Sequence, residues 1–164
     1  MMFRELLTKN LIICTNMKCS CKPFDNHFDF QHDNRNIVPF EDKKGKQYRY
    51  INQSANHLAK YRVDGGLISD NDPKCDFLLL NCEQKQSYFI ELKGADINRS
   101  IEQIDRSIDI LRKNLPDFAF FARIVLSKTP PTSVKNTKLA NLEKKVKSLK
   151  GNVKKQTRLL EEAI

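Results

Sequence analysis

The sequence lacks any apolar run long enough to cross a membrane, which takes about 20 consecutive apolar residues. Its N-terminal apolar stretch, 11–14, is too short for the hydrophobic region of a signal peptide and has no small-residue cleavage site. No internal repeat is visible in the chain. We therefore expect a cytoplasmic protein with no membrane segment.

The sequence also lacks the paired cysteines of a disulfide framework. It has five cysteines, an odd number, in 164 residues that are 40% apolar, enough to bury a core without covalent cross-links. Reduced thiols are the simpler interpretation and fit the cytoplasm. A zinc knuckle formed by Cys14, Cys19, Cys21, His27 and His32 is an alternative, but the cysteine spacing matches no standard zinc pattern.

Two apolar runs, 74–80 and 86–93, predict neighbouring strands that carry charged residues at their ends. Asp76 lies in the first run, and Glu91 and Lys93 end the second. Because side chains alternate along a strand, Glu91 and Lys93 project from one face, and a neighbouring strand can bring Asp76 beside them. A charge in an apolar strand is costly and therefore indicates a specific role. The alternative is an ion pair on a solvated face.

These residue types suit the hydrolysis of a phosphodiester. Carboxylates such as those of Asp76 and Glu91 are the usual protein ligands of Mg²⁺, which keeps several of its waters. A metal held in this way polarises a phosphoryl oxygen and lowers the pKa of a bound water. Lys93 would orient that water or help to deprotonate it, and would stabilise charge in the transition state. Mn²⁺ is the second metal that we expect to serve.

This arrangement resembles the PD-(D/E)XK nuclease superfamily, which includes many restriction endonucleases and Holliday-junction resolvases. The resemblance rests on Asp76, fourteen intervening residues and Glu91-Leu92-Lys93, followed by a helix and another apolar strand. It covers about residues 50 to 127, and Cys75 stands where the name-giving proline would be. The resemblance implies metal ligands at Asp76 and Glu91, a catalytic lysine at Lys93, and an α/β fold with a restriction-endonuclease-like core, a central mixed sheet flanked by helices.

Two further residues are candidates for the same site. Several branches of the superfamily have a glutamine on the helix after the Glu-x-Lys strand, which points to Gln103 as a substrate-contacting or site-ordering residue. An ordinary glutamine at the helix boundary is the alternative. The superfamily sometimes places another acid on a helix before the first core strand. Here Asp64 is the acidic candidate for a further metal ligand, although the sequence Asp-Gly-Gly is also typical of an ordinary turn.

The chain divides at about residue 47. The polar stretch 25–36 shows no periodicity, and residues 1–47 predict an irregular N-terminal extension, whereas 48–164 predict a single nuclease-like α/β domain. Within that domain the spacing of apolar residues predicts a helix over 51–61, followed over 63–68 by a turn into a strand or a strand with a bulge. It also predicts a helix from 97 to about 114 that is capped by Asp96, and an apolar strand over 118–126.

The basic charge of the chain is concentrated near its C-terminal end. From Lys135 onward nine lysines or arginines face three glutamates, a surplus of six out of a net charge of +9. Apolar residues between 139 and 149 predict an amphipathic helix ended by Gly151. The residues from 152 to 160 predict a closing strand or a short helix, with Glu161 and Glu162 ending it in solvent.

A basic helix attracts phosphates and would steer a polyanion to the protein. The lysines expected to contact nucleic acid are Lys138, Lys144, Lys145 and Lys147. A solvated lysine-rich helix with no partner is the alternative. Few aromatic residues lie among these lysines, so base stacking of the kind used to bind single strands is not indicated.

Three hypotheses follow. The first is a Mg²⁺-dependent nuclease acting on nucleic acid, with DNA as the expected substrate and a homodimer as one option, because two strands need two sites. The second is a catalytically inactive protein of the same fold that acts as a nucleic-acid-binding or protein-interaction module. The third is a small interaction protein whose basic helix docks an acidic partner.

Overall fold

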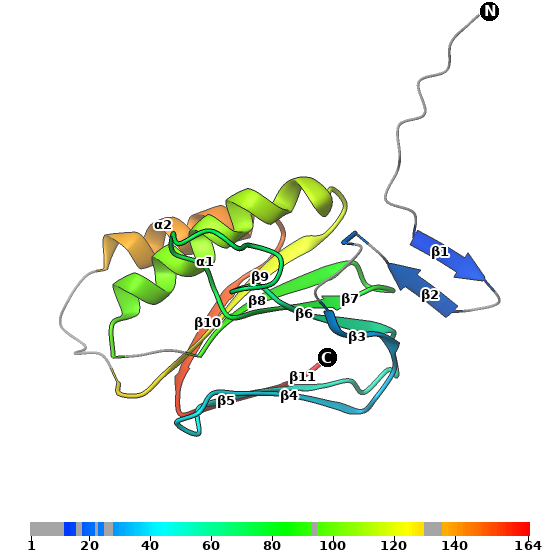
Figure 1. The fold of residues 1–164 in the computed structure, drawn as a ribbon, viewed down its shortest axis with the longest axis horizontal. Coiled ribbons are helices and arrows are strands. Elements are labelled where there is room, and N and C mark those ends of the chain that lie inside the picture. Colours follow the sequence, from blue (N-terminus) through cyan, green and yellow to red (C-terminus); the bar gives the residue numbers. More distant parts are fainter. Residues whose placement is uncertain (1–11, 16–17, 22, 25–27, 93–94, 130–135) are drawn as a thin grey trace, which may run out of the picture.

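Two sheets and two helices form three stacked layers in the computed structural model (Figure 1). The model describes residues 12–15, 18–21, 23–24, 28–92, 95–129 and 136–164. A six-stranded sheet forms the middle layer, the helices cover one of its faces, and a three-stranded sheet covers the other. The predicted α/β fold with a central mixed sheet flanked by helices is therefore confirmed, with the helices on one face only.

The middle sheet has the strand order β10-β9-β8-β7-β6-β3. Its strands are β3 (Phe28–Asp33), β6 (Leu58–Arg62), β7 (Phe77–Asn81), β8 (Gln86–Glu91), β9 (Ala119–Leu126) and β10 (Val153–Thr157). β6, β7 and β8 form an antiparallel meander, whereas β8, β9 and β10 run parallel. The carboxyl ends of the three parallel strands therefore lie along one edge of the sheet, which we call the carboxyl edge.

The two helices are the crossover connections of this parallel part. α1 (Ile97–Leu111) joins β8 to β9 and is followed by the 3-10 helix η1 (Arg112–Asn114), and α2 (Thr137–Ser148) joins β9 to β10. The Asp96 carboxylate accepts hydrogen bonds from two backbone N–H groups of the first turn of α1, as the sequence predicts. The Asn136 side chain caps α2 in the same way. Both helices therefore begin at the carboxyl edge.

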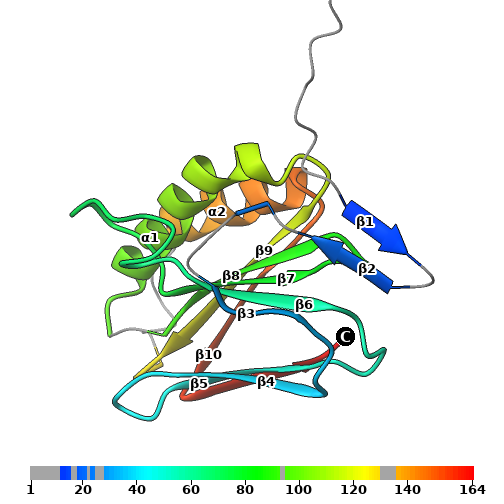
Figure 2. The ribbon, with the colours of Figure 1, turned by 45° about the vertical axis from the view of Figure 1, so that its right-hand side comes forward.

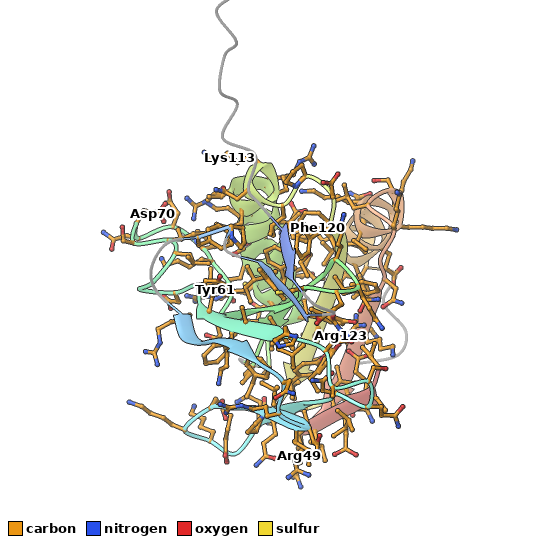
Figure 3. The ribbon with its side chains drawn as sticks, turned by 90° about the vertical axis from the view of Figure 1, so that its right-hand side faces the viewer. Arg49, Tyr61, Asp70, Lys113, Phe120 and Arg123 are labelled. Atoms are coloured by element: carbon orange, nitrogen blue, oxygen red, sulfur yellow. The ribbon has the colours of Figure 1, made fainter. Side chains whose placement is uncertain are left out.

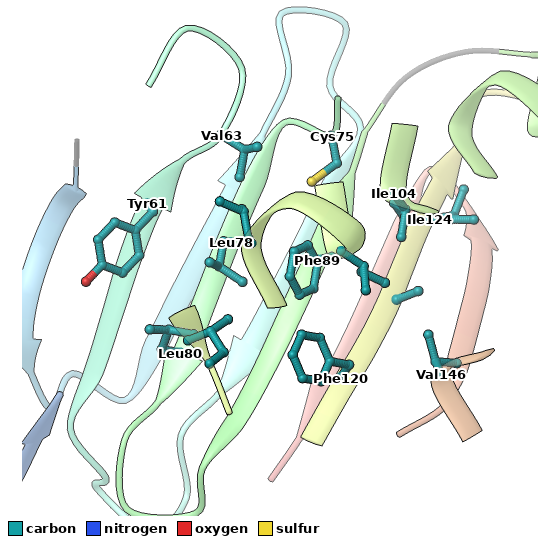
Figure 4. Packing of buried hydrophobic residues seen from close by; sticks show 14 of the residues in the cluster. Tyr61, Val63, Cys75, Leu78, Leu80, Phe89, Ile104, Phe120, Ile124 and Val146 are labelled. Atoms are coloured by element: carbon teal, nitrogen blue, oxygen red, sulfur yellow. The ribbon is translucent and has the colours of Figure 1, made fainter. Parts of the chain in front are cut away.

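The larger hydrophobic core lies between the helices and the middle sheet (Figure 4). Phe89 of β8 and Phe120 of β9 stack with ring centroids 5.8 Å apart and an interplanar angle of 15°. Ile104 of α1 and Val146 of α2 are fully buried against this sheet face. Each buried side chain of this size contributes about 1.5–3 kcal/mol to folding, so the apolar stripes of the two helices explain where they lie.

A second core lies between the middle sheet and the smaller sheet. The smaller sheet has the order β11-β5-β4 and comprises β4 (Ile37–Glu41), β5 (Gln47–Ile51) and β11 (Leu159–Ala163). Val38, Phe40, Tyr48 and Tyr50 alternate with exposed or half-buried neighbours along β4 and β5 and are fully buried. The alternation fits a sheet with one face toward the core.

The sequence-based assignment of residues 1–47 as an irregular extension is wrong for its described strands. β4 and β5 form an antiparallel hairpin across residue 47, and β3 pairs with β6. β1 (Ile12–Thr15) and β2 (Lys18–Cys21) form a separate two-stranded sheet (Figure 2). Strand pairing between distant segments leaves little local signal, and the polar residues of this region hide the alternation.

The helix predicted over 51–61 is also wrong. This segment forms the end of β5, a turn and most of β6. The Asn52 side chain organises the turn: its Oδ1 accepts from the backbone N–H of Asn56, and its Nδ2 donates to the carbonyls of Asn56 and Arg35. These turn contacts and the strand pairing on either side override a weak helical spacing. The segment 63–68 is a turn with an isolated bridge between Asp64 and Ile68.

The C-terminal part of the chain forms strands rather than a short helix. β10 completes the middle sheet and β11 the smaller one, and α1, β9 and α2 lie where the sequence predicts them. Glu162 is buried instead of ending the chain in solvent. Cys82 is disulfide-bonded, so the prediction of reduced cysteines is wrong at this position. Among the described helices none is both long and apolar enough to span a bilayer.

Candidate functional site

Hydrogen bonds to β8 bring Asp76 beside Glu91. Asp76 directly precedes β7, whose first residue, Phe77, pairs with Ile90. Asp76 bonds to β8 on both sides of Glu91, through the Ile90 carbonyl and the Leu92 N–H. Glu91 lies on the helix-covered face, because Phe89, two residues before it in β8, belongs to the larger core.

Backbone hydrogen bonds hold Asp76 in place. The Asp76 carboxylate accepts a hydrogen bond from the Leu92 N–H at 2.9 Å, and the Asp76 N–H donates to the Ile90 carbonyl at 3.1 Å. Asp76 is half-buried, whereas Glu91 has no exposed surface. The site therefore has one carboxylate that reaches solvent and one that is enclosed.

The buried Cys75 thiol interacts with the charges of both acids. Burial raises the pKa of the thiol well above its ordinary value, and the negative charges of Glu91 and Asp76 raise it further, while a hydrogen bond with Ser107 acts in the opposite direction. Cys75 is a free, buried cysteine and stays protonated at neutral pH. Asp76 and Glu91 therefore both lie near this buried thiol.

One flank of α1 fixes the segment that leads into Asp76. The Gln103 side-chain amide donates to the Lys74 carbonyl at 3.0 Å, and Ser107 Oγ accepts from the Cys75 N–H at 2.9 Å. Ser107 Oγ also donates to the Gln103 carbonyl at 2.7 Å. Both side chains are buried. Gln103 therefore holds the backbone that leads into Asp76.

Sequence analysis missed the role of Ser107. The available signal was its i, i+4 spacing from Gln103 on the small polar flank of the helix, which places both side chains on one face.

Asp64 does not join the other two acids. It lies in the exposed turn after β6, where its carboxylate oxygen is 3.7 Å from the Lys74 ammonium. Lys74 in turn donates to the carbonyls of Asp70 and Asp72. Within the described part of the chain, no three His, Cys, Asp or Glu side chains are arranged to hold a metal ion. Lys93, the predicted catalytic lysine, lies outside the described residues.

The Asp76 and Glu91 pair fits a magnesium ion by the chemistry of its donors. Mg²⁺ is commonly bound through one or two carboxylates plus water and substrate phosphates, so a third protein carboxylate is not required. A bound cation would place positive charge beside the buried Glu91 carboxylate and stabilise its negative charge. The half-buried Asp76 offers the side of the pair from which an ion and its waters can enter.

The lysines of α2 that were predicted to contact nucleic acid fall into two groups. Lys138 pairs with Glu102, and Lys145 pairs with Asp105 and Asp109 at 2.7 and 2.6 Å, so both join α2 to α1. Lys144 and Lys147 are exposed and make no ion pair with any described residue. Half of the predicted basic surface is thus neutralised by the neighbouring helix.

Comparison with known proteins adds no relative: no family model, no curated protein and no solved structure matches this chain.

Proposed function

We propose that the chain is a metal-dependent nuclease that hydrolyses phosphodiester bonds in nucleic acid, with Asp76 and Glu91 as the metal ligands. The observation that carries the proposal is that Asp76 bonds to β8 on both sides of Glu91, through the Ile90 carbonyl and the Leu92 N–H, while Glu91 is fully buried. DNA as the substrate, a homodimer and a cytoplasmic location remain predictions from the sequence.

A bound Mg²⁺ or Mn²⁺ would supply positive charge at the phosphoryl oxygen and an acidified water. The chain's own residues do the positioning. The Leu92 N–H fixes the orientation of the Asp76 carboxylate, and the Gln103 amide fixes the backbone just before it. Lys93, two residues after Glu91, is the group that we expect to orient the attacking water and balance developing charge.

The order of the elements also supports the proposal. Asp76 directly precedes β7, β8 carries Glu91 at its end, and α1 and β9 follow. This strand, strand, helix, strand order agrees with the core expected from the resemblance to the PD-(D/E)XK superfamily. Because many functions share one fold, the argument rests on the site and not on the topology.

The test is cleavage of single-stranded, duplex and branched DNA and RNA with Mg²⁺ or Mn²⁺. We expect the wild type to cleave at least one substrate, Lys93→Ala to be about 10² to 10⁴ times slower, and Asp76→Asn to be inactive. Asp117→Asn, which removes an exposed acid, is the matched control and should cleave like the wild type. A well-folded wild type that cleaves nothing with either metal would exclude the nuclease.

A second candidate function is a nuclease-fold module that binds nucleic acid without cutting it. It is favoured by one observation, that no third acid joins Asp76 and Glu91 among the described residues. Salt-dependent binding of nucleic acid that neither needs metal nor leads to cleavage would identify this module.

A further inference from the structure

Three cation-bearing segments are tied together at the carboxyl edge. The backbone N–H of Arg158, between β10 and β11, donates to the carbonyl of Leu126 at the end of β9 at 2.9 Å. The Arg158 carbonyl accepts from the N–H of Gln47 at 2.8 Å, directly after the β4–β5 turn. The β4–β5 turn, the end of β9 and the β10–β11 junction therefore meet at one place, on the lower left of Figure 1.

Four exposed cations lie on these segments, and we call them the basic rim: Lys43, Lys44, Lys128 and Arg158. None of them forms an ion pair with any residue that the structure describes. Two nearby acids are already neutralised, since Asp42 pairs with Lys46 at 2.6 Å and Glu161 with Arg49 at 3.5 Å. Glu41 remains as an exposed acid at the start of the turn. The rim is therefore a net positive surface.

The register places the basic rim close to the two candidate metal ligands. Glu91 pairs with Ile124, and Ile124 pairs with Lys155, so Glu91 and Lys155 are two strands apart in one row, about 10 Å. Arg158 follows three residues later, about another 10 Å along the chain. The rim thus begins about 14 Å from Glu91, which corresponds to roughly four nucleotides of one strand at 3.4 Å each.

We propose that the basic rim binds the phosphates of a nucleic acid strand that flank the bond presented to Asp76 and Glu91. The inference rests on the proposed function and assigns the contact surface of its substrate. The α2 helix is the less suitable surface, because Lys138 and Lys145 are held by acids of α1. The rim lysines and arginine have no such competitor, so each can release a counterion from a phosphate.

The test compares two variants of equal net charge. The rim variant carries Lys43→Gln, Lys44→Gln, Lys128→Gln and Arg158→Gln. The control carries Lys85→Gln, Arg112→Gln, Lys113→Gln and Lys150→Gln, which are exposed and lie at the opposite edge, where β8, β9 and β10 begin (Figure 3 labels Lys113). Both lose four positive charges, so any difference between them reports position and not total charge.

Binding to a labelled duplex of about 20 base pairs is measured at several salt concentrations. Divalent metal is left out so that no cleavage occurs. A plot of log K against log salt has a negative slope. We expect the size of this slope to decrease by about 3 to 4 for the rim variant and by less than about 1 for the control. Equal losses in the two variants, or no loss in the rim variant, would overturn the proposal.

The same assay separates this inference from the proposed function. Asp76→Asn should bind the duplex like the wild type while losing cleavage. If the wild type binds through the rim but never cleaves, the proposed nuclease activity is excluded and the proposed binding surface is supported. If the rim variant binds and cleaves like the wild type, the proposed binding surface is excluded and the proposed nuclease activity is supported. Circular dichroism and thermal unfolding establish that each variant is folded before it is scored.

Discussion

Glu162 has three partners inside the protein. Arg123 donates from two of its guanidinium nitrogens to the two carboxylate oxygens, Tyr48 donates its hydroxyl at 2.7 Å, and Lys154 donates its ammonium at 2.7 Å. Arg123 and Glu162 are both almost fully buried, Arg123 on β9 of the middle sheet and Glu162 on β11 of the smaller sheet. A bidentate charged contact therefore joins the two sheets.

Removing one member of this pair should be costly. We expect Glu162→Gln to lower the free energy of unfolding by about 3 kcal/mol, because Arg123 would keep its charge in a buried place without a carboxylate. Urea unfolding measures the change. The double variant Arg123→Met/Glu162→Leu should lose less than Glu162→Gln, because no charge is left buried, and a larger loss in the double variant would contradict this explanation.

The same residue predicts how stability depends on acid. Burial alone would raise the pKa of the Glu162 carboxyl, but the hydrogen bonds and charge of Arg123, with Lys154 and Tyr48, outweigh it and lower the pKa below the ordinary value of 4.5. A lowered pKa adds stability that is fully present above pH 4.5 and is lost as the pH falls through the folded-state value. Urea unfolding between pH 6 and pH 2 should therefore show a smaller acid loss in Glu162→Gln than in the wild type.

At this scale the sequence predicts some residues and not others. Asp76 and Glu91 could be proposed because a charge within an apolar run is a local signal, and Gln103 because the resembled superfamily has a glutamine on this helix. Their roles stay predictions. The partnership of Arg123 and Glu162 has no local signal, since the residues are 39 positions apart and Glu162 stands in a polar stretch. Only the pairing of β11 with β5 carries Glu162 to the core.

Among the elements, the end of α2 differs from its expected form. The residue with left-handed backbone is Lys150, with φ of 66°, and not Gly151. Gly151 is needed for space, because a Cβ there would lie 1.6 Å from the Phe120 carbonyl oxygen of β9. The sequence places the end of α2 within a few residues, but the helix ends at Ser148, and Gly151 is required for a different physical reason.

This difference predicts opposite effects of two substitutions. Gly151→Ala should lower the free energy of unfolding by about 2 kcal/mol or more, because two backbone segments would have to separate. Lys150→Gly should raise it by up to about 1 kcal/mol, because glycine adopts the left-handed conformation without strain. Thermal unfolding of both variants checks the pair, and a harmless Gly151→Ala would show that β9 and the turn can move apart.

The contact between the two helices gives another matched pair. We expect Lys145→Ala to lower the free energy of unfolding by about 0.5 to 1 kcal/mol, since Lys145 bridges two acids of α1, and Lys144→Ala to change it by only a few tenths. High salt should shrink the difference, because it screens ion pairs near the surface. Equal effects of the two substitutions would mean that the bridge contributes nothing measurable.

The whole molecule shows which parts of a fold leave a pattern in the sequence. α1, α2, β7, β8 and β9 were predictable because each has a continuous apolar stripe or run. The smaller sheet was not, because β4 and β11 come from distant parts of the chain and only one face of each strand is buried. The three-layer arrangement follows from pairings that no single segment encodes.

A metal held by the whole fold should also stabilise it. If Asp76 and Glu91 bind Mg²⁺ in the native state, about 10 mM Mg²⁺ raises the free energy of unfolding by RT ln(1 + [Mg²⁺]/Kd), which is about 2.7 kcal/mol at a hundredfold excess over Kd. The midpoint of thermal unfolding rises accordingly. We expect this shift in the wild type and in Asp117→Asn, and its loss in Asp76→Asn. A shift that persists in Asp76→Asn would place the ion elsewhere.

The segment from Val153 to Ala163 supplies an outer strand to each sheet, β10 to one and β11 to the other, with Arg158 at the crossing. The ribosome makes this segment after all the remaining strands of the two sheets. A nascent chain that stops short of it has two open sheet edges, and the guanidinium of Arg123 still lacks the carboxylate of Glu162. Closure of the domain during translation must therefore wait for these residues to leave the exit tunnel.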